Sequence, residues 1–548
     1  MRIFIFLIVT LVSISTTAQK PFITTFSPDW GPIGTTVSIM GDNFNGNEDS
    51  NIVYFGPVKG IVLDATQYEL LVRVPAGAGF QPITVTTGGY TLAASRPFRV
   101  TASAGGMDFS SGSFGPAVSI SGGSNIAVAD FDGDGKIDLA HAGFYQSSIA
   151  VYRNTTVNQV FSVQSAWSSS IQNPRDIRIA DMNGDGLPDL VVSANLNRII
   201  AVYKNTSTAG SISFSYSPVL CTTTEGAPND LAVVDIDKDG KPDIATVVED
   251  ADKISVFRNA SGESIAFDAE KSFGTDDAPW RINAGDLNRD GYPELITTQY
   301  SLFRGARIFE NKSSPGSISF TSSFYSVPQR VYDAAIGDFD GDNKMDVLLT
   351  DRVSNTLTVL RNTTESGAIT FASPVVKDVS STPADLVLGD LNGDGKPEPA
   401  MASYFSSSQV CIVKNNSSSG IIDFGTQYQT YSTGTGTFDV VLADMNGDGR
   451  TDILTGNSQG TPVSISYLQN NLNFTANEPP VVETYTTAAN GKWSEPATWV
   501  GGSVPPAGVN IIIKHIVSAN FSRICNSITI EPGGNCTVEP AVKLTLLQ

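Results

Sequence analysis

The chain has 548 residues and a formal net charge of −21. This length leaves room for about three or four domains. The acid excess argues against nucleic acid as a partner, because binding phosphates needs clustered lysine and arginine. The four cysteines, Cys221, Cys411, Cys525 and Cys536, are too few for a disulfide scaffold. Cys525 and Cys536 either pair or are buried free thiols.

Residues 1–18 are predicted to be a secretory signal. Met1-Arg2 precedes a mainly apolar run from Ile3 to Val12, and small residues lead up to Ala18, after which we expect cleavage. The apolar run is too short to span a bilayer, and no other stretch qualifies as a membrane span. We therefore expect a secreted or cell-surface protein.

Residues 21–100 predict a small β-sandwich, because apolar residues alternate in short segments that glycine and proline interrupt. The opening, Pro21-Phe-Ile-Thr-Thr-Phe-Ser-Pro28, and the stretch from Gly31 to Phe44 resemble an IPT/TIG domain. Its later strands are matched, in order, by Val53-Tyr-Phe-Gly56, Val74-Pro-Ala-Gly77 and Pro82-Ile-Thr-Val85. The resemblance implies an immunoglobulin-like spacer or interaction module, and such a fold implies no activity by itself.

A nine-residue loop recurs seven times between residues 105 and 475. Its pattern is Asp-x-Asp/Asn-x-Asp-Gly-x-x-Asp/Glu, and neighbouring copies begin 51 to 54 residues apart. One copy alone would be interpreted as a turn, since Asp and Gly are common turn residues. Seven copies at a steady period indicate one repeated structural unit.

The acidic positions of these loops are suited to a hard cation, which we expect to be Ca²⁺. The loops are not EF-hands, because position 12 of the first is His141 and strand-like segments flank it. Asn343 replaces the turn glycine in the fifth loop and is a residue that tolerates the left-handed conformation. The predicted ligands are positions 1, 3, 5, 7 and 9 of each loop: Asp130, Asp132, Asp134, Lys136, Asp138; Asp181, Asn183, Asp185, Leu187, Asp189; Asp235, Asp237, Asp239, Lys241, Asp243; Asp286, Asn288, Asp290, Tyr292, Glu294; Asp338, Asp340, Asp342, Lys344, Asp346; Asp390, Asn392, Asp394, Lys396, Glu398; and Asp444, Asn446, Asp448, Arg450, Asp452.

Each repeat predicts four antiparallel strands. In the second repeat these are Asp176–Asp181, Leu190–Ser193, Ile200–Tyr203 and Ile212–Ser215. Seven such units over residues 105–475 predict a seven-bladed β-propeller, whereas a solenoid would need atypical capping repeats, which are not visible. Met107–Phe114 resembles a fourth strand that precedes the first loop, so we expect it to complete the last blade and latch the ring.

The third predicted strand of every repeat ends at an asparagine: Asn154, Asn205, Asn259, Asn311, Asn362, Asn415 and Asn470. All but Asn470 head an Asn-x-Ser/Thr triplet, which could mark glycan acceptors. Because the asparagine recurs where the third strand must turn into the fourth, we interpret it as a turn residue.

The array as a whole resembles the FG-GAP or VCBS repeats of integrin-α-like propellers. Crowded carboxylates repel one another unless a cation neutralises them, so cation binding becomes folding energy. We therefore expect up to seven structural Ca²⁺ ions; the alternative is Ca²⁺ that also bridges to a ligand. Calcium sites of this kind suit an extracellular location, where the ion is plentiful.

Residues 476–483 are predicted to be a linker. Beyond them, residues 484–548 resemble the entry to a β-helix or G8-like module, through Gly491-Lys-Trp493, Ile511–Ile513 and Ser527–Ile530. The chain stops as these coils begin, as expected of a piece of a longer polypeptide. The fold class predicted overall is all-β: a sandwich, a propeller and a partial β-helix.

Aromatic and arginine residues gather on one predicted face of the disc. The loops and asparagine turns share one face because strands alternate direction, so the other connections form the second face. Rings with polar tips are common at surfaces that bind sugars and proteins; the alternative is packing between blades. The predicted ligand-binding residues on the second face are Tyr145, Trp280, Tyr300, Arg304, Tyr332 and Tyr404.

No catalytic constellation is visible in the sequence. The two histidines, His141 and His515, lie in different domains, and the Gly-x-Ser-x-Gly match at Gly456–Gly460 lacks the following helix of a nucleophile elbow. We expect a non-catalytic binding or adhesion module for a glycan or protein at a cell surface, of unknown oligomeric state. The alternatives are a polysaccharide lyase or hydrolase, or a chain that only presents a distal domain.

Overall fold

The computed structural model describes residues 20–546, apart from 103–104, 276–277, 300–303, 329, 366, 380–381, 405–407, 426, 461, 474–483, 495, 499, 501–508, 520–522, 531–534 and 539–543. This part is built of β-strands, with three short 3₁₀ helices, η1 (Glu48–Ser50), η2 (Glu249–Ala251) and η3 (Pro496–Thr498). None of its helices is long and apolar enough to cross a membrane. The predicted signal and linker lie outside the described residues.

The N-terminal strands form the predicted sandwich. Their bounds are β1 (Phe22–Ser27), β2 (Trp30–Gly31), β3 (Thr36–Asp42), β4 (Asn51–Phe55), β5 (Val58–Lys59), β6 (Ile61–Ala65), β7 (Glu69–Arg73), β8 (Pro82–Thr87), β9 (Tyr90–Pro97) and β10 (Arg99–Val100). One sheet has the order β1–β3–β7–β6, the other β5–β4–β8–β9, and β2 and β10 pair in parallel. Alternate residues such as Val37, Ile39, Val53 and Phe55 point inward and form the core.

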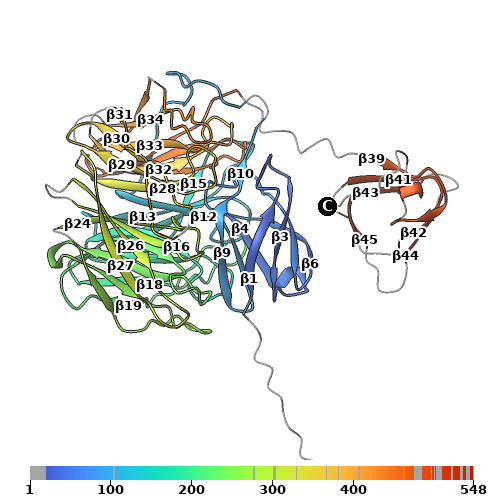
Figure 1. Ribbon diagram of the computed structural model, residues 1–548, viewed down its shortest axis with the longest axis horizontal. Helices are drawn as coiled ribbons and strands as arrows, with labels where there is room; N and C mark the ends of the chain where they lie inside the picture. The colour runs from blue at the N-terminus through green and yellow to red at the C-terminus, as the bar shows by residue number, and fades with distance from the viewer. Residues whose placement is uncertain are drawn as a thin grey trace, which may run out of the picture.

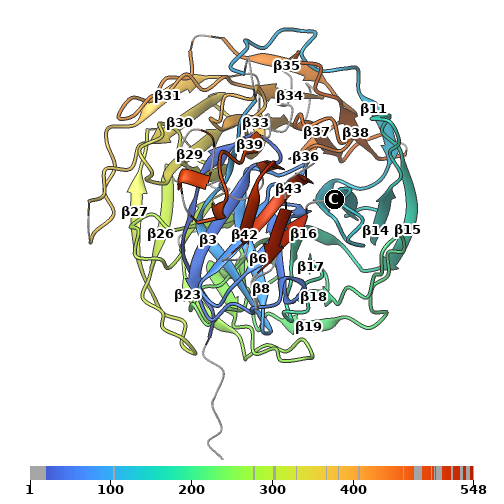
Figure 2. The ribbon, with the colours of Figure 1, turned by 90° about the vertical axis from the view of Figure 1, so that its right-hand side faces the viewer.

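Seven four-stranded antiparallel sheets follow as the blades of a ring (Figure 2). From the innermost strand outward they are β12 (Asn125–Ala129), β13 (Asp138–Gly143), β14 (Ser148–Asn154), β15 (Val163–Ser170); β16 (Pro174–Ala180), β17 (Asp189–Ala194), β18 (Ile199–Tyr203), β19 (Val219–Thr222); β20 (Pro228–Val234), β21 (Asp243–Val248), β22 (Lys253–Phe257), β23 (Lys271–Gly274); β24 (Pro279–Gly285), β25 (Glu294–Gln299), β26 (Gly305–Asn311), β27 (Phe320–Ser326); β28 (Asp333–Gly337), β29 (Asp346–Asp351), β30 (Thr356–Leu360), β31 (Val375–Asp378); β32 (Pro383–Gly389), β33 (Glu398–Ser403), β34 (Gln409–Ile412), β35 (Gln429–Ser432); and β36 (Thr437–Ala443), β37 (Asp452–Asn457), β38 (Ser464–Leu468), β11 (Val118–Ser121).

Burial explains why each repeat forms a blade. The second strand of every blade is buried along its whole length, as in β21, because neighbouring blades cover both of its faces. The outermost strands are mostly exposed, as in β23. The innermost strand of each blade contacts the innermost strands of both neighbours, and β12 contacts β36, so the ring is closed.

The outermost strands lie later in the chain than predicted. In the second blade the paired strand is β19, and the predicted segment at Ile212–Ser215 makes only an isolated bridge between Phe214 and Asn205. Phe214 is buried against Phe131, so its apolar character reflects packing beneath the loop. The latch is shifted in the same way: Phe114 bridges to Asn470, and β11 pairs with β38 to complete the last blade.

The recurrent asparagines connect neighbouring blades. Each is at most 3% exposed. The side-chain amide of Asn259 donates to the carbonyl of Pro242 in its own loop at 2.9 Å and to that of Met182 in the preceding blade at 2.8 Å. The same pair of bonds recurs at the other six positions. The Oδ1 of Asn259 also accepts the main-chain N–H of Ser261, two residues on, at 2.8 Å, which is the bond expected of a turn asparagine. The buried amides are unsuited to carry a glycan.

Replacing one of these asparagines is expected to loosen the ring. Asn259→Ala removes both amide bonds and leaves two buried carbonyls without donors, at a cost of about 2–3 kcal/mol in the free energy of unfolding. Urea unfolding with saturating calcium measures this loss. The exposed Asn197 is the matched control, since its backbone is not left-handed, and an Asn197→Ala variant that lost as much stability would contradict the assignment.

Carboxylates form a second set of bonds between blades, on the innermost strands. Each accepts a main-chain N–H from the following blade: Asp176 from Leu231, Asp230 from Ile282, Asp333 from Leu386, Asp385 from Val440 and Asp439 from Ile126. Two arginines lie among them. Arg178 contacts Asp176 at 2.9 Å and Asp230 at 3.1 Å, and Arg281 contacts Asp230 at 3.3 Å and Asp385 at 3.2 Å.

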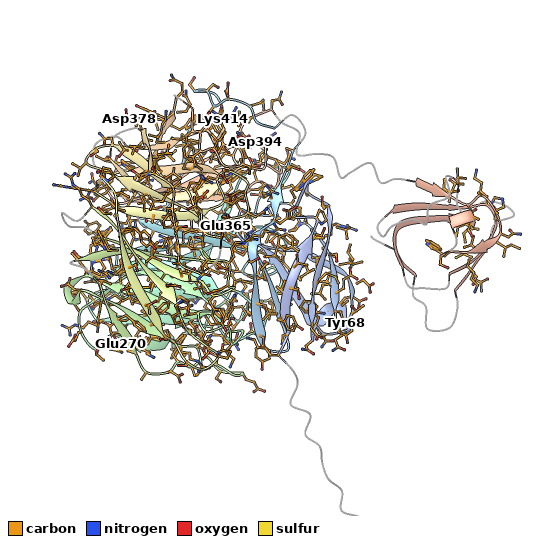
Figure 3. All side chains as sticks on the ribbon, in the orientation of Figure 1. Tyr68, Glu270, Glu365, Asp378, Asp394 and Lys414 are labelled. Atoms are coloured by element: carbon orange, nitrogen blue, oxygen red, sulfur yellow. The ribbon has the colours of Figure 1, made fainter. Side chains whose placement is uncertain are left out.

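The sandwich packs on the ring face that carries the acidic loops (Figure 1). The hydroxyl of Thr86 donates to Asp181 Oδ2 at 2.9 Å, and the main-chain N–H of Thr91 donates to the Gly240 carbonyl at 2.8 Å. Tyr68 lies on the side of the sandwich away from the ring (Figure 3). A cavity of about 310 Å³ lies on the axis between the sandwich and the innermost strands, so the sandwich closes one mouth of the ring.

The C-terminal strands are parallel. They are β39 (Thr484–Thr486), β40 (Gly491–Lys492), β41 (Val509–Ile513), β42 (Ile516–Ala519), β43 (Arg523–Ile530), β44 (Asn535–Val538) and β45 (Leu544–Leu546). Odd-numbered strands form one parallel sheet and even-numbered strands another. This alternation is the topology expected of β-helix coils, while the G8-like family of the segment stays a prediction. Cys536 is a free thiol.

Candidate functional site

The seven acidic loops share one hydrogen-bond pattern. In the first loop the N–H of Gly135, at position 6, donates to Asp130 at 2.9 Å, and the N–H of Phe131, at position 2, donates to Asp138 at 3.0 Å. Both bonds recur in the other six loops. Position 6 is left-handed throughout, including Asn343 with φ of 65°. The glycine or asparagine there is therefore required by the turn.

Carboxylate oxygens converge in the loops that carry Asp at position 3. Three of them lie within 4.8 Å of one another in each of three groups: Asp130, Asp132 and Asp138; Asp235, Asp237 and Asp239; and Asp338, Asp340 and Asp346. Buried side-chain oxygens without a hydrogen-bond partner occur at Asn183, Asp235 and Asp286. An all-oxygen donor set with unpartnered oxygens fits Ca²⁺, and the side chains at position 7, such as Leu187, leave only a main-chain carbonyl as ligand there.

Burial disfavours the charged form of the carboxyl at position 9, which closes each loop and is called the closing carboxyl below. Withdrawal from water raises the pKa of Asp138, Asp243 and Asp346 to about 8 and that of Glu294 to about 7. The pKa values of Asp189, Glu398 and Asp452 shift in the same direction for the same reason. A bound cation would stabilise the ionised form, so the electrostatics of the cage favour a cation.

Basic side chains beside the loops are a feature that the sequence reasoning missed. Arg153 Nε lies 2.7 Å from Asp132 and its Nη2 contacts Asp134, and Arg258 contacts Asp237 and Asp239 in the same way. Lys204 lies 3.2 Å from Asp185. Each of these bases directly precedes the recurrent asparagine, and that position is basic in five of the seven repeats. This regularity could have revealed them.

A second candidate site lies at the mouth of the axis opposite the sandwich. It is a cavity of about 210 Å³. Four of the six predicted ligand-binding residues line it, namely Tyr145, Trp280, Tyr332 and Tyr404. Tyr300 lies outside the described residues, and Arg304 is not among the lining residues and instead donates to the Pro328 carbonyl at 2.9 Å.

The sequence reasoning missed other walls of this cavity. They are Ser124, Asn125, Arg175, Asn229, Asp230, Arg352, Phe438 and Ser458. Arginines stack on rings here: the guanidinium carbon of Arg175 lies 4.3 Å from the ring centre of Phe144, and that of Arg352 lies 4.3 Å from that of Tyr332. Arg175 and Phe144 come from neighbouring blades, so no local sequence pattern joins them, whereas Tyr332 and Arg352 flank the first two strands of one blade.

Comparison with protein families agrees with this geometry. The FG-GAP-like repeat family matches residues 130–192, 181–246, 235–297 and 338–399, and the FG-GAP repeat family matches residues 437–471. These ranges contain all seven loops. The ring is an FG-GAP propeller. The sandwich is an IPT/TIG domain, because that family matches residues 21–101.

Several solved structures are similar in part to this chain. A virginiamycin B lyase from Staphylococcus aureus is 11% identical, with a TM-score of 0.42, over 65% of this chain and 99% of that one. An auxiliary nutrient binding protein from Bacteroides thetaiotaomicron is 13% identical, with a TM-score of 0.33, over 82% and 98%. A protein from Lactobacillus plantarum is 11% identical, with a TM-score of 0.41, over 71% and 98%. These TM-scores are too low to bear on function. None of the curated proteins matches the chain.

Two residues of the propeller, Ser458 and His141, could suggest catalysis, but the contacts around them are structural ones. Ser458 lies in a turn after β37, as predicted, and its hydroxyl donates to the Gly436 carbonyl at 3.0 Å. His141 is buried on β13 and stacks on Tyr152, and burial lowers its pKa to about 4. His141 is therefore neutral at physiological pH.

Proposed function

We propose that this FG-GAP chain is an exported, calcium-stabilised and non-catalytic module that binds a glycan at the open mouth of its propeller. The observation that carries the proposal is the convergence of Tyr145, Trp280, Tyr332 and Tyr404 on one cavity. The other mouth is covered by the IPT/TIG domain. A ligand that approaches the axis therefore has this entrance available.

The size and shape of the cavity favour a sugar over a protein partner. A stable protein interface buries roughly 800 Å² on each side over a broad surface. The cavity here is concave, with a volume of about 210 Å³, and its aromatic walls offer apolar faces together with polar tips. Such walls suit the end of a glycan chain, which presents one ring with hydroxyl groups at its edge.

The cavity chemistry favours binding without turnover. Hydrolysis of a glycosidic bond commonly uses two carboxylates placed on either side of the bond. Among the described lining residues, Asp230 is the one carboxylate, and it contacts Arg178 and Arg281 and accepts the N–H of Ile282. The polysaccharide-degrading alternative would need a second acid from elsewhere.

The calcium and export parts of the proposal rest on the loops and the domain families. FG-GAP and IPT/TIG domains are typical of extracellular proteins, and calcium sites of moderate affinity fill where calcium is plentiful. The oxygen donors of the loops suit that ion, and its primary role would be structural because the loops lie at the junctions between blades.

A glycan array tests the proposal. The full chain, labelled and supplied with calcium, is expected to bind a subset of oligosaccharides saturably. Tyr145→Ala is expected to weaken binding about tenfold, because it removes one aromatic wall of the cavity. Tyr145 is 70% exposed, so its removal spares the core. Tyr216→Ala is the matched control, since Tyr216 is 93% exposed elsewhere on the ring and is expected to leave binding unchanged.

Two results would overturn the proposal. One is the absence of saturable binding to any glycan, and the other is binding that survives Tyr145→Ala unchanged. New reducing ends released from a bound oligosaccharide would favour the enzyme class instead.

A further inference from the structure

The charge of the open cavity is opposite to that of the protein. Three arginines line it, Arg175, Arg281 and Arg352, against the single described carboxylate of Asp230. The chain as a whole carries −21. The lining therefore carries more arginines than acids, unlike the chain as a whole.

Two of these arginines are already engaged. Arg281 contacts Asp230 and Asp385 at 3.3 and 3.2 Å and is 7% exposed, so it neutralises carboxylates of the innermost strands. Arg352 lies over the ring of Tyr332. The two carboxylates offset the charge of Arg281, whereas the charge of Arg352 contributes to the potential inside the cavity, where the surrounding protein screens charge less than water does.

Arg175 is the arginine that lacks an ionic partner. No carboxylate of the described residues lies within 4.0 Å of it, and its buried Nε has no hydrogen-bond partner. Its guanidinium is held over the ring of Phe144. Withdrawal from water lowers its pKa from the usual value, with partial compensation from Glu249. A guanidinium in such a place is poorly solvated, and because Arg175 lines the cavity, a ligand there can supply the missing partner.

We propose that the bound glycan carries a carboxylate, as in a uronic acid, and that Arg175 receives it. This inference rests on the proposed glycan-binding function and specifies its ligand class. The planar fork of a guanidinium donates two parallel hydrogen bonds to a carboxylate. The guanidinium carbon of Arg175 lies 4.3 Å from the ring centre of Phe144, and Trp280 and Tyr145 line the same cavity and offer walls for a sugar ring.

The experiment compares acidic sugars with their uncharged counterparts. The probes are galacturonate, glucuronate and mannuronate oligosaccharides, their methyl esters and sulfated neutral oligosaccharides, titrated into the calcium-loaded full chain. The methyl ester keeps the size of the sugar and removes its charge. We expect the preferred acid to bind at least tenfold more tightly than its ester, because hydrogen bonds between charged groups are about twice as strong as neutral ones.

Substitutions then assign the preference to one residue. Arg175→Met keeps the length of the side chain and is expected to bring the affinity for the acid down to that for the ester, without changing the affinity for the ester. Arg175→Lys keeps the charge and loses the fork, so it is expected to fall between the two. Arg304→Met is the matched control, because Arg304 lies outside the cavity lining. Thermal unfolding of each variant identifies any that fail to fold.

The outcomes separate this inference from the function on which it rests. Equal binding of acids and esters, or a preference that survives Arg175→Met, would overturn the carboxylate assignment while glycan binding stood. A preference for sulfated over carboxylated sugars would also overturn it. If neither acids nor neutral sugars bind, the proposed function itself fails.

Discussion

Removal of calcium is expected to lower the melting temperature by more than about 10 °C. A cation that binds only the folded loops stabilises the fold by RT ln(1 + [L]/Kd), which is about 1.4 kcal/mol per site when free calcium exceeds Kd tenfold. Seven such sites contribute roughly 10 kcal/mol, enough for a shift of this size in a ring of several hundred residues. Calorimetry in calcium and in EDTA measures it, and protease cleavage within residues 105–475 is expected to increase in EDTA.

Single-loop variants show whether the effect belongs to the loops. Asp243→Asn removes the closing carboxylate of the third loop, and its calcium-dependent stabilisation is expected to fall by about one site, or about 1.4 kcal/mol. Asp378→Asn is the control, because Asp378 is exposed on the outermost strand β31 (Figure 3). Equal melting temperatures in calcium and in EDTA would contradict the structural role of the ion.

The pH dependence of the metal-free protein gives an independent check. The carboxyls at position 9 of three loops, Asp138, Asp243 and Asp346, have pKa values of about 8 in the folded state, against an ordinary value of 3.8. Between these values the folded state binds more protons than the unfolded state, so stability declines as pH rises. In EDTA the melting temperature is therefore expected to fall between about pH 6 and 8, and the gain from calcium is expected to be larger at the higher pH. A metal-free protein that gained stability over this window would contradict the assignment.

Loss of the Arg281 guanidinium is expected to cost about 3–5 kcal/mol, the usual penalty for removing one partner of a buried ion pair. Arg281 neutralises Asp230 and Asp385 at the axis. In Arg281→Leu these carboxylates keep their main-chain donors, Ile282 and Val440, but lose their shared cation. Urea unfolding in saturating calcium measures the loss.

An exposed arginine controls for this experiment. Arg304 is exposed and donates to the Pro328 carbonyl, so Arg304→Leu is expected to change stability by less than about 0.5 kcal/mol. If Arg281→Leu were as stable as Arg304→Leu, the ion pairs of Arg281 with Asp230 and Asp385 would not contribute to stability, and the prediction would be wrong.

The parts of the fold that a periodic pattern specifies could be predicted from sequence. The loops, the buried second strands and the turn asparagines recur in every blade, so seven weak signals reinforce one another. The outermost strands were misplaced because they are short and mostly polar, whereas Phe214 beneath the loop gave the stronger apolar signal. The calcium assignment itself stays a prediction.

The open cavity was predictable only in part. The alternating direction of the strands predicted that Tyr145, Trp280, Tyr332 and Tyr404 share one face of the ring, and in the structure all four line one cavity. The pairing of Arg175 with Phe144 joins residues of two blades and has no periodic signature. Packing of the IPT/TIG domain over the loops depends on polar contacts such as Thr86 with Asp181, which no local pattern reveals.

The latch strand has a mechanical consequence. In the pair β11–β38, Val118 lies opposite Tyr467 and Ser121 opposite Ser464. The chain toward the sandwich leaves from Val118 and the chain toward the C-terminal strands leaves beyond Leu468, so both tethers depart from the same end of the pair. Tension between them would peel the two strands apart and break their hydrogen bonds one after another. Peeling needs less force than shear, which loads all the bonds of the pair together. Because the sandwich is itself bonded to the ring, a pull on its chain is borne first by the Thr91–Gly240 and Thr86–Asp181 contacts, and the closure is protected from load.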